Sequence, residues 1–207
     1  MDLLKRLNTT GIVTPDDRFT AEQVADVHEY LKPQKLWLGG HWSAYARETN
    51  IPTEEFMADP DYSCALACYP FSVPERAPHL RDKALQYESL AQDYFGAEAK
   101  LFVVNIFWSF PGGPLKPEIQ EWHRDMCTFD EKQLAMIIYL SDVDADTAHC
   151  YRGEGDDPVA MTGPAGTFFI ENCYGFHKGQ KPKEKCRLMA VARYGISVPE
   201  YTSWKNG

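Results

Sequence analysis

The spacing of hydrophobic residues changes character near residue 100. Before that point, two stretches repeat their apolar residues every three or four positions, as one face of a helix does. A capping box at Thr20 and Gln23 opens the first repeat, which stops before Pro33. The second covers residues 78–95 and ends at Gly96, a natural helix stop. We therefore predict two helices in the first half of the chain.

Beyond residue 100, short β-branched and aromatic runs alternate with turn residues. The run LFVVNIFWSF at 101–110 predicts a buried strand, and shorter runs of the same kind follow it. The expected strands cover residues 101–110, 119–125, 134–140, 148–152, 158–161, 166–171, 176–179 and 187–194. About eight short strands bounded by Gly, Pro or Asp predict a mainly β fold with flanking α-helices. The expected core is a double-stranded β-helix, the jelly roll of cupin-like proteins.

No internal repeat, low-complexity tract or linker divides the 207 residues, which favours a single domain. Within it we expect a helical N-terminal part at residues 1–100 that packs on the core. The jelly-roll core is expected at residues 101–195, and residues 196–207 would form a C-terminal tail.

Net charge and the lack of long apolar runs argue against some classes of binding partner. The net charge of −9 argues against nucleic acid or an anionic membrane, because both select for Lys and Arg patches. No apolar run has the length of a signal sequence or of a membrane span, so we expect a cytoplasmic protein. The sequence leaves the oligomeric state open.

Candidate chemistry begins at the tetrapeptide Trp122-His123-Arg124-Asp125. In an extended chain, residues two apart face the same side, so His123 and Asp125 offer an imidazole and a carboxylate to one point. This pair is two thirds of a facial metal site, although alone it is more typical of a surface hydrogen-bonded pair. His177 lies between two glycines, before the last strand. In a jelly roll it can meet His123 and Asp125 across the barrel mouth, whereas His149 is a lesser candidate.

Arg187 opens the last predicted strand, ten residues after His177. A guanidinium inside a barrel needs an anion, and a carboxylate is its best partner. A 2-oxo acid with a distal carboxylate would reach both the metal and Arg187. The alternative is an exposed strand charge that pairs with any nearby carboxylate.

These segments resemble one known family. The WHxD motif at residues 122–125, the HxG motif at His177 followed by Pro182, and Arg187 ten residues after that His are similar to the phytanoyl-CoA dioxygenase-like branch of the Fe(II)/2-oxoglutarate-dependent dioxygenases. The resemblance spans residues 101–195. It implies that His123, Asp125 and His177 bind iron and that Arg187 binds 2-oxoglutarate. Asn105 and Tyr139 are further candidates for hydrogen bonds to the co-substrate.

The resemblance implies an enzyme that uses Fe(II), 2-oxoglutarate and O2 to hydroxylate an unactivated C–H bond of a small molecule, with release of succinate and CO2. Asp125 argues against halogenation, because a small residue replaces this carboxylate in halogenating relatives. Desaturation, ring closure and epimerisation use the same ligands and stay open. So do a non-catalytic cupin-like protein that binds a metal or small ligand and a metal dioxygenase that does not need 2-oxoglutarate.

Two further residues near the motif raise questions. Arg193 lies six residues after Arg187, a spacing found in nucleic-acid demethylases of the superfamily, but Met189 and Val191 between them are apolar and the net charge opposes that function. Cys127 follows Asp125 closely, and the sequence does not tell whether its thiol faces the iron.

Overall fold

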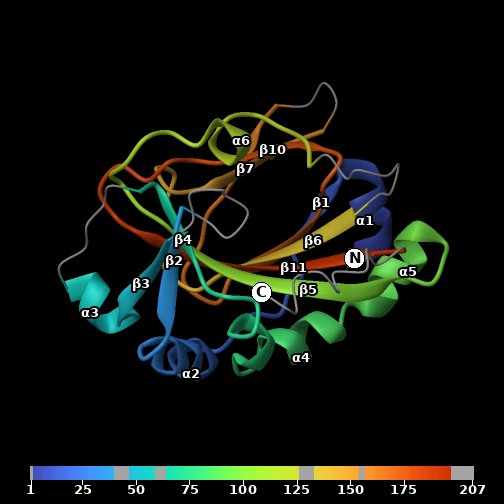
Figure 1. Ribbon diagram of the computed structural model, residues 1–207. Helices are drawn as coiled ribbons and strands as arrows, with labels where there is room; N and C mark the ends of the chain where they lie inside the picture. Colours follow the sequence, from blue (N-terminus) through green and yellow to red (C-terminus); the bar gives the residue numbers. More distant parts are fainter. Residues whose placement is uncertain (1, 40–46, 59–63, 126–132, 154–156, 197–207) are drawn as a thin grey trace.

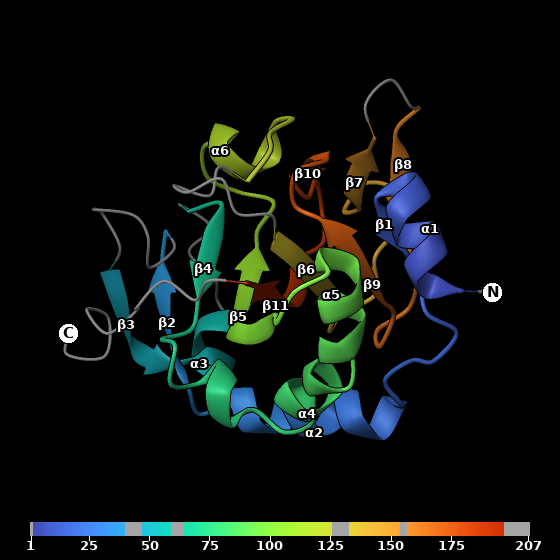
Figure 2. The ribbon, with the colours of Figure 1, turned by 90° about the vertical axis from the view of Figure 1, so that its right-hand side faces the viewer.

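Two β-sheets face each other, and helices cover the outer side of the larger one (Figures 1 and 2). The computed structural model describes residues 2–39, 47–58, 64–125, 133–153 and 157–196. In spatial order, the larger sheet contains β1 (Ile12–Val13), β9 (Phe168–Asn172), β6 (Gln133–Tyr139), β11 (Arg187–Gly195), β5 (Lys100–Ser109), β4 (Leu66–Cys68), β2 (Lys35–Leu38) and β3 (Arg47–Pro52). The smaller sheet contains β10 (Phe176–Gly179), β7 (His149–Arg152) and β8 (Val159–Met161). This is the predicted mainly β, jelly-roll architecture with flanking helices.

The helices belong mostly to the first half of the chain. They are α1 (Leu3–Thr10), α2 (Ala21–Leu31), α3 (Thr53–Ala58), the 3-10 turn η1 (Pro74–Arg76), α4 (Leu80–Leu85), α5 (Glu88–Phe95) and α6 (Pro117–Gln120). The predicted capping box is present, since the side chains of Thr20 and Gln23 each accept a hydrogen bond from the other residue's backbone N–H. None of the described helices is long and apolar enough to cross a membrane.

The strand β11 shows why the sheet is stable, because both of its faces are buried. Leu188, Ala190 and Ala192 belong to the core between the larger sheet and the helices. Met189 and Val191 point the other way, into a second cluster between the two sheets. A strand that is buried on both faces has a continuous apolar run in its sequence, as residues 188–192 do.

Three expectations need correction. Residues 119–125 are not a strand: α6 ends at Gln120, because Pro117 suits the first helical turn and the Gln120 side chain accepts the Lys116 N–H at 2.7 Å. The helix expected over 78–95 is two helices, α4 and α5. The chain turns between them at Tyr87, whose ring packs on Phe168 and whose hydroxyl donates to Asp17.

The N-terminal part is also more than helical. Its described residues supply β1 to β4, which extend the larger sheet at both of its ends. Helical periodicity does not reveal these strands because they are short, and the longest of them, β3, is the polar segment RETNIP. The N-terminal residues therefore complete the sheet as well as cover it.

Candidate metal centre

The candidate ligands His123 and His177 are held together by their own backbones. The N–H of His123 donates to the carbonyl of His177 at 3.0 Å, and the N–H of His177 donates back to His123 at 2.9 Å. Two residues on, the N–H of Asp125 donates to Cys173 at 3.2 Å. This narrow antiparallel pairing does what the predicted strand was expected to do, since it brings both His side chains and Asp125 to the same side.

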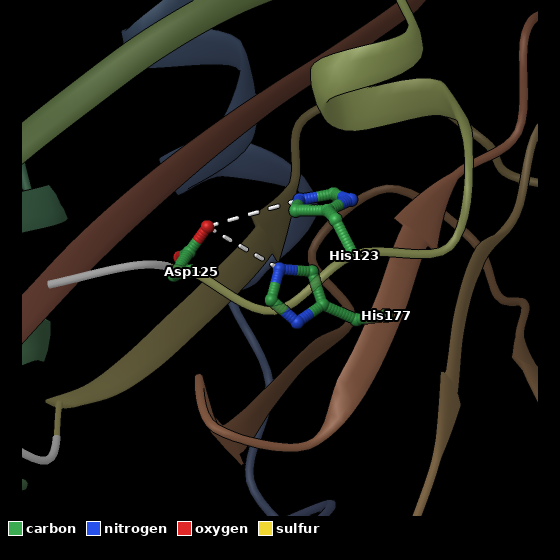
Figure 3. A group of neighbouring side chains, drawn as sticks. All are labelled: His123, Asp125 and His177. Atoms are coloured by element: carbon green, nitrogen blue, oxygen red, sulfur yellow. Dashed lines mark ion pairs between the residues drawn. The ribbon is translucent and has the colours of Figure 1, made fainter.

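The three side chains converge on one point between the sheets (Figure 3). Asp125 Oδ1 lies 3.5 Å from His177 Nε2 and 3.7 Å from His123 Nε2. One ligand atom from each residue lies within 4.8 Å of the other two. Within the described part of the chain, this is the one group of three or more His, Cys, Asp or Glu residues that could hold a metal ion.

Both imidazoles present the ring nitrogen that a metal needs. His123 Nδ1 lies 2.8 Å from the Glu121 carbonyl, and His177 Nδ1 lies 3.0 Å from the Gly175 carbonyl. A carbonyl can only accept, so each Nδ1 carries the proton and each Nε2 keeps its lone pair. Two imidazole nitrogens and one carboxylate oxygen are the donor set of a non-haem Fe(II) facial triad, so the residues fit that metal.

Arg193 occupies the other oxygen of Asp125. Its Nη1 lies 2.5 Å from Asp125 Oδ2 and 3.6 Å from Cys173 Sγ. Burial alone would raise the pKa of Asp125, but the charges of Arg193 and His177 hold that pKa well below its usual range. The carboxylate is therefore ionised, with Oδ1 free to face a metal. The sequence contained the signal for Arg193, because its even spacing from Arg187 puts both on one strand face.

The two imidazoles differ in their affinity for protons. Burial lowers the pKa of His123 below its ordinary value. Burial acts in the same sense on His177, but Asp125 and the nearby charge of Glu171 outweigh it and raise the pKa of His177. Without a metal, His177 is the imidazole that protonates first as the pH falls.

A buried pair lies behind His177. His149 Nε2 is 2.8 Å from Glu171 Oε2, and both side chains are almost fully buried. The His149 ring stacks on the His177 ring with centroids 5.6 Å apart. His149 thus supports a candidate ligand and is not one of the three converging residues. Sequence reasoning missed Glu171, although its position two residues after Phe169 on β9 places it on the inner face.

Arg187 is buried, and no carboxylate pairs with it among the described residues. Its side chain donates to the Thr147 carbonyl and, at 3.2 Å, to Ser109 Oγ. Its Nε is buried with no hydrogen-bond partner among the described residues, and no ion pair there involves it. Gly179 leaves room for the guanidinium, because a Cβ at that position would lie 2.8 Å from Nη2. A buried cation without a counter-charge is costly, so this position suits an anionic ligand.

Asn105 and Tyr139, the two further candidates for hydrogen bonds to a co-substrate, differ in whether their polar groups already have partners. Asn105 lies on β5 opposite Val191, and its buried Oδ1 has no partner among the described residues. The Tyr139 hydroxyl is already engaged: it donates to the Met161 carbonyl at 2.7 Å and accepts the His149 N–H at 3.1 Å. Tyr139 therefore joins the two sheets and has no proton left to donate to a co-substrate. Cys127 lies outside the described residues.

Comparison with known proteins gives similarity in structure but not in sequence. No protein-family model matches the chain, and no curated protein matches it. HygX from Streptomyces hygroscopicus, solved with nickel, 2-oxoglutarate and hygromycin B bound, superposes with a TM-score of 0.64 at 15% identity. That match covers 96% of this chain and 87% of HygX.

Two further solved structures share the fold. The alpha-ketoglutarate-dependent carbocyclase SnoK from nogalamycin biosynthesis has a TM-score of 0.61 at 15% identity, over 93% of this chain and 82% of SnoK. An oxidoreductase of the 2OG-Fe(II) oxygenase family from Burkholderia pseudomallei has a TM-score of 0.60 at 14% identity, over 95% of this chain and 91% of its own. At such low identity these similarities establish the fold.

Proposed function

We propose that this chain is an Fe(II)- and 2-oxoglutarate-dependent oxygenase that hydroxylates an unactivated C–H bond of a small molecule. We further propose that it belongs to the phytanoyl-CoA dioxygenase-like branch, on the motifs at residues 122–125 and 175–187. The observation that carries the proposal is the convergence of His123, Asp125 and His177, with both Nε2 atoms and one carboxylate oxygen directed at the same point.

In this proposal the three residues hold the iron and leave part of its surroundings for other ligands. With 2-oxoglutarate and O2, a bound iron would supply oxidation of a C–H bond, coupled to conversion of 2-oxoglutarate to succinate and CO2. The protein orients the donor atoms. The Glu121 and Gly175 carbonyls hold the rings of His123 and His177, and Arg193 keeps Asp125 ionised.

Arg187 would bind the distal carboxylate of 2-oxoglutarate. Its guanidinium is buried, has no carboxylate partner among the described residues and keeps an unused N–H. Asn105 on the neighbouring strand would add a polar contact through its unpartnered Oδ1, which calls for a donor such as a water or a hydroxyl. HygX, which shares the fold, was solved with nickel and 2-oxoglutarate bound, and this supports the choice of co-substrate.

A small organic molecule is the proposed primary substrate. HygX holds hygromycin B, and the epimerase SnoN was solved in complex with nogalamycin RO, so this fold accepts molecules of that size. Hydroxylation is the proposed outcome. The names of the carbocyclase SnoK and the epimerase SnoN show that the same fold also carries ring closure and epimerisation.

Formation of succinate tests the proposal. Protein loaded with Fe(II) should convert 2-oxoglutarate to succinate in an O2-dependent reaction, faster when a substrate is present. Asp125→Ala should reduce succinate to the level of a reaction without protein. Arg187→Met should reduce it by more than about tenfold at the 2-oxoglutarate concentration that half-saturates the parent, in line with the loss of a charge partner. Metal binding without succinate above background, across a panel of candidate small molecules, would identify a binding protein and refute the oxygenase.

A further inference from the structure

Cationic side chains and aromatic rings alternate in a row beside the candidate metal ligands. The row joins the segment around His123 to the strands β10 and β7. The Arg124 guanidinium carbon lies 4.4 Å from the centre of the Phe176 ring, and that of Arg152 lies 5.1 Å from the same centre. Arg152 is also 4.9 Å from the Trp122 ring, and Lys178 Nζ lies 5.0 Å from Trp122. The contacts thus run from Arg124 through Phe176, Arg152 and Trp122 to Lys178. We call these five residues the cation–aromatic stack.

Four of the five stack residues are the direct sequence neighbours of the candidate ligands. Trp122 and Arg124 are the residues on either side of His123, and Phe176 and Lys178 are those on either side of His177. Successive side chains of a strand point to opposite faces, so Phe176 and Lys178 on β10 point away from the face that carries His177. Trp122 packs against the cluster between the two sheets. Arg152 comes from β7, where it is registered directly opposite Phe176.

The backbone alone connects the two ligand segments weakly. Among the described residues, the segment of His123 forms a single isolated bridge, to His177, and one further hydrogen bond from Asp125 to Cys173. By contrast, β11 is paired along its whole length with β5. Each ring in the stack contacts a cation from a neighbouring segment, so the stack connects the segments where the ladder is short. All five side chains are partly buried, which strengthens such contacts relative to fully exposed ones.

We propose that the cation–aromatic stack is a clamp that aligns the His123 segment with β10 and so sets the distance between the two imidazoles. Its members act as positioning residues, because none of them is among the converging donor groups. Arg152 is the central member, since it contacts both rings. The consequence for metal affinity rests on the proposed iron site, whereas the alignment of the backbone is a property of the metal-free protein.

Arg152→Gln gives the sharpest test, because it keeps a polar side chain but removes the shared cation. In the metal-free protein, hydrogen exchange at the His123 and His177 amides should become about tenfold faster, while the β6 and β11 amides are unchanged. Binding of Ni(II), measured by calorimetry, should weaken about tenfold, within the range seen when partners of metal ligands are lost. If Arg152 acted only through its charge, Arg152→Gln would instead bind Ni(II) more tightly, because loss of a nearby positive charge favours binding of a divalent cation.

Three variants complete the design. Arg152→Lys should restore most of the affinity, since it keeps the cation, and Phe176→Leu should reproduce the loss with no change of charge. Lys185→Gln removes an exposed positive charge outside the stack and should leave both measurements unchanged. Unaltered exchange at both amides, or tighter Ni(II) binding, in Arg152→Gln and Phe176→Leu would overturn the clamp. If the unmodified protein bound no Ni(II), the iron proposal would fail, and the exchange rates would still decide the clamp.

Discussion

The two sheets hold their candidate functional groups in different ways. In the larger sheet, Arg187 and Arg193 project from β11, which is paired on both sides and buried on both faces. In the smaller sheet, His177 lies on the short strand β10. His123 lies beside it on a segment that forms a single bridge among the described residues. The larger sheet thus positions Arg187 and Arg193 through backbone pairing. The positions of the candidate metal ligands depend instead on the side chains around them. Changes near the ligands should therefore affect metal binding far more than folding.

The largest effect is expected from His123→Ala. His123 is partly exposed and contributes little to the core, so the variant should fold with a melting temperature within a few degrees of the parent. Loss of one of three metal donors should weaken Ni(II) or Fe(II) binding by more than about a hundredfold. Calorimetric titration and thermal unfolding on the same samples measure both quantities. A variant that bound metal as tightly as the parent would remove His123 from the site.

Arg187→Met tests the role of the larger sheet in this comparison. Replacing the buried guanidinium should weaken 2-oxoglutarate binding by about a hundredfold, because the co-substrate carboxylate would be left without its charge partner. Metal affinity should stay within twofold of the parent. The free energy of unfolding without 2-oxoglutarate should change by only about 1 kcal/mol. The lost hydrogen bonds are offset by removal of a buried charge that has no carboxylate partner among the described residues.

The matched control for Arg187 is Lys181→Met, which removes a partly buried cation whose Nζ donates to the Gly113 carbonyl. This variant should bind 2-oxoglutarate like the parent. Equal losses in both variants would mean that general positive charge, and not the Arg187 position, attracts the co-substrate.

Arg193→Met should change how metal affinity depends on pH. Arg193 lowers the pKa of Asp125, so in the parent this carboxylate stays ionised, and the stability that it contributes disappears only if the pH falls through that lowered pKa. Without Arg193, only His177 would oppose the effect of burial on Asp125, so the pKa of this carboxyl would rise and protons would compete with metal as the pH falls. Ni(II) affinity should then fall about tenfold more between pH 7.5 and pH 5.5 in the variant than in the parent.

The parent provides the reference slope for that experiment. The raised pKa of His177 means that its protonated form stabilises the metal-free protein below the unfolded value of about 6.5, and that this contribution is lost as the pH rises through the folded value. Metal binding needs the neutral ring, so parent affinity should increase with pH over this range. Parallel pH profiles for parent and variant would show that Arg193 does not control Asp125.

The smallest effect is expected from Thr20→Ala, far from the site. Loss of the capping box should lower the free energy of unfolding by about 1 kcal/mol, as measured by urea denaturation. Ni(II) and 2-oxoglutarate binding should not change. A change in metal affinity in this variant would show that the helical layer and the ligands are coupled, contrary to the comparison of the two sheets.

The sequence predicted the strands that are long and apolar, because β-branched runs such as those of β5, β6 and β11 favour one structure locally. It did not predict α6, where Pro117 and the Gln120 side chain override a short apolar pattern. It placed His123, Asp125 and His177 together through their order and spacing. It could not place Glu171 against His149, because that contact depends on how two separate strands meet.

The central claim is that His123, Asp125 and His177 hold iron together with 2-oxoglutarate at Arg187. Anaerobic addition of Fe(II) and then 2-oxoglutarate, followed by visible absorption spectroscopy, tests it most directly. A weak metal-to-ligand charge-transfer band should appear with the parent protein, disappear in His123→Ala, and require a much higher 2-oxoglutarate concentration in Arg187→Met. Absence of the band in the parent, or an unchanged band in His123→Ala, would contradict the claim.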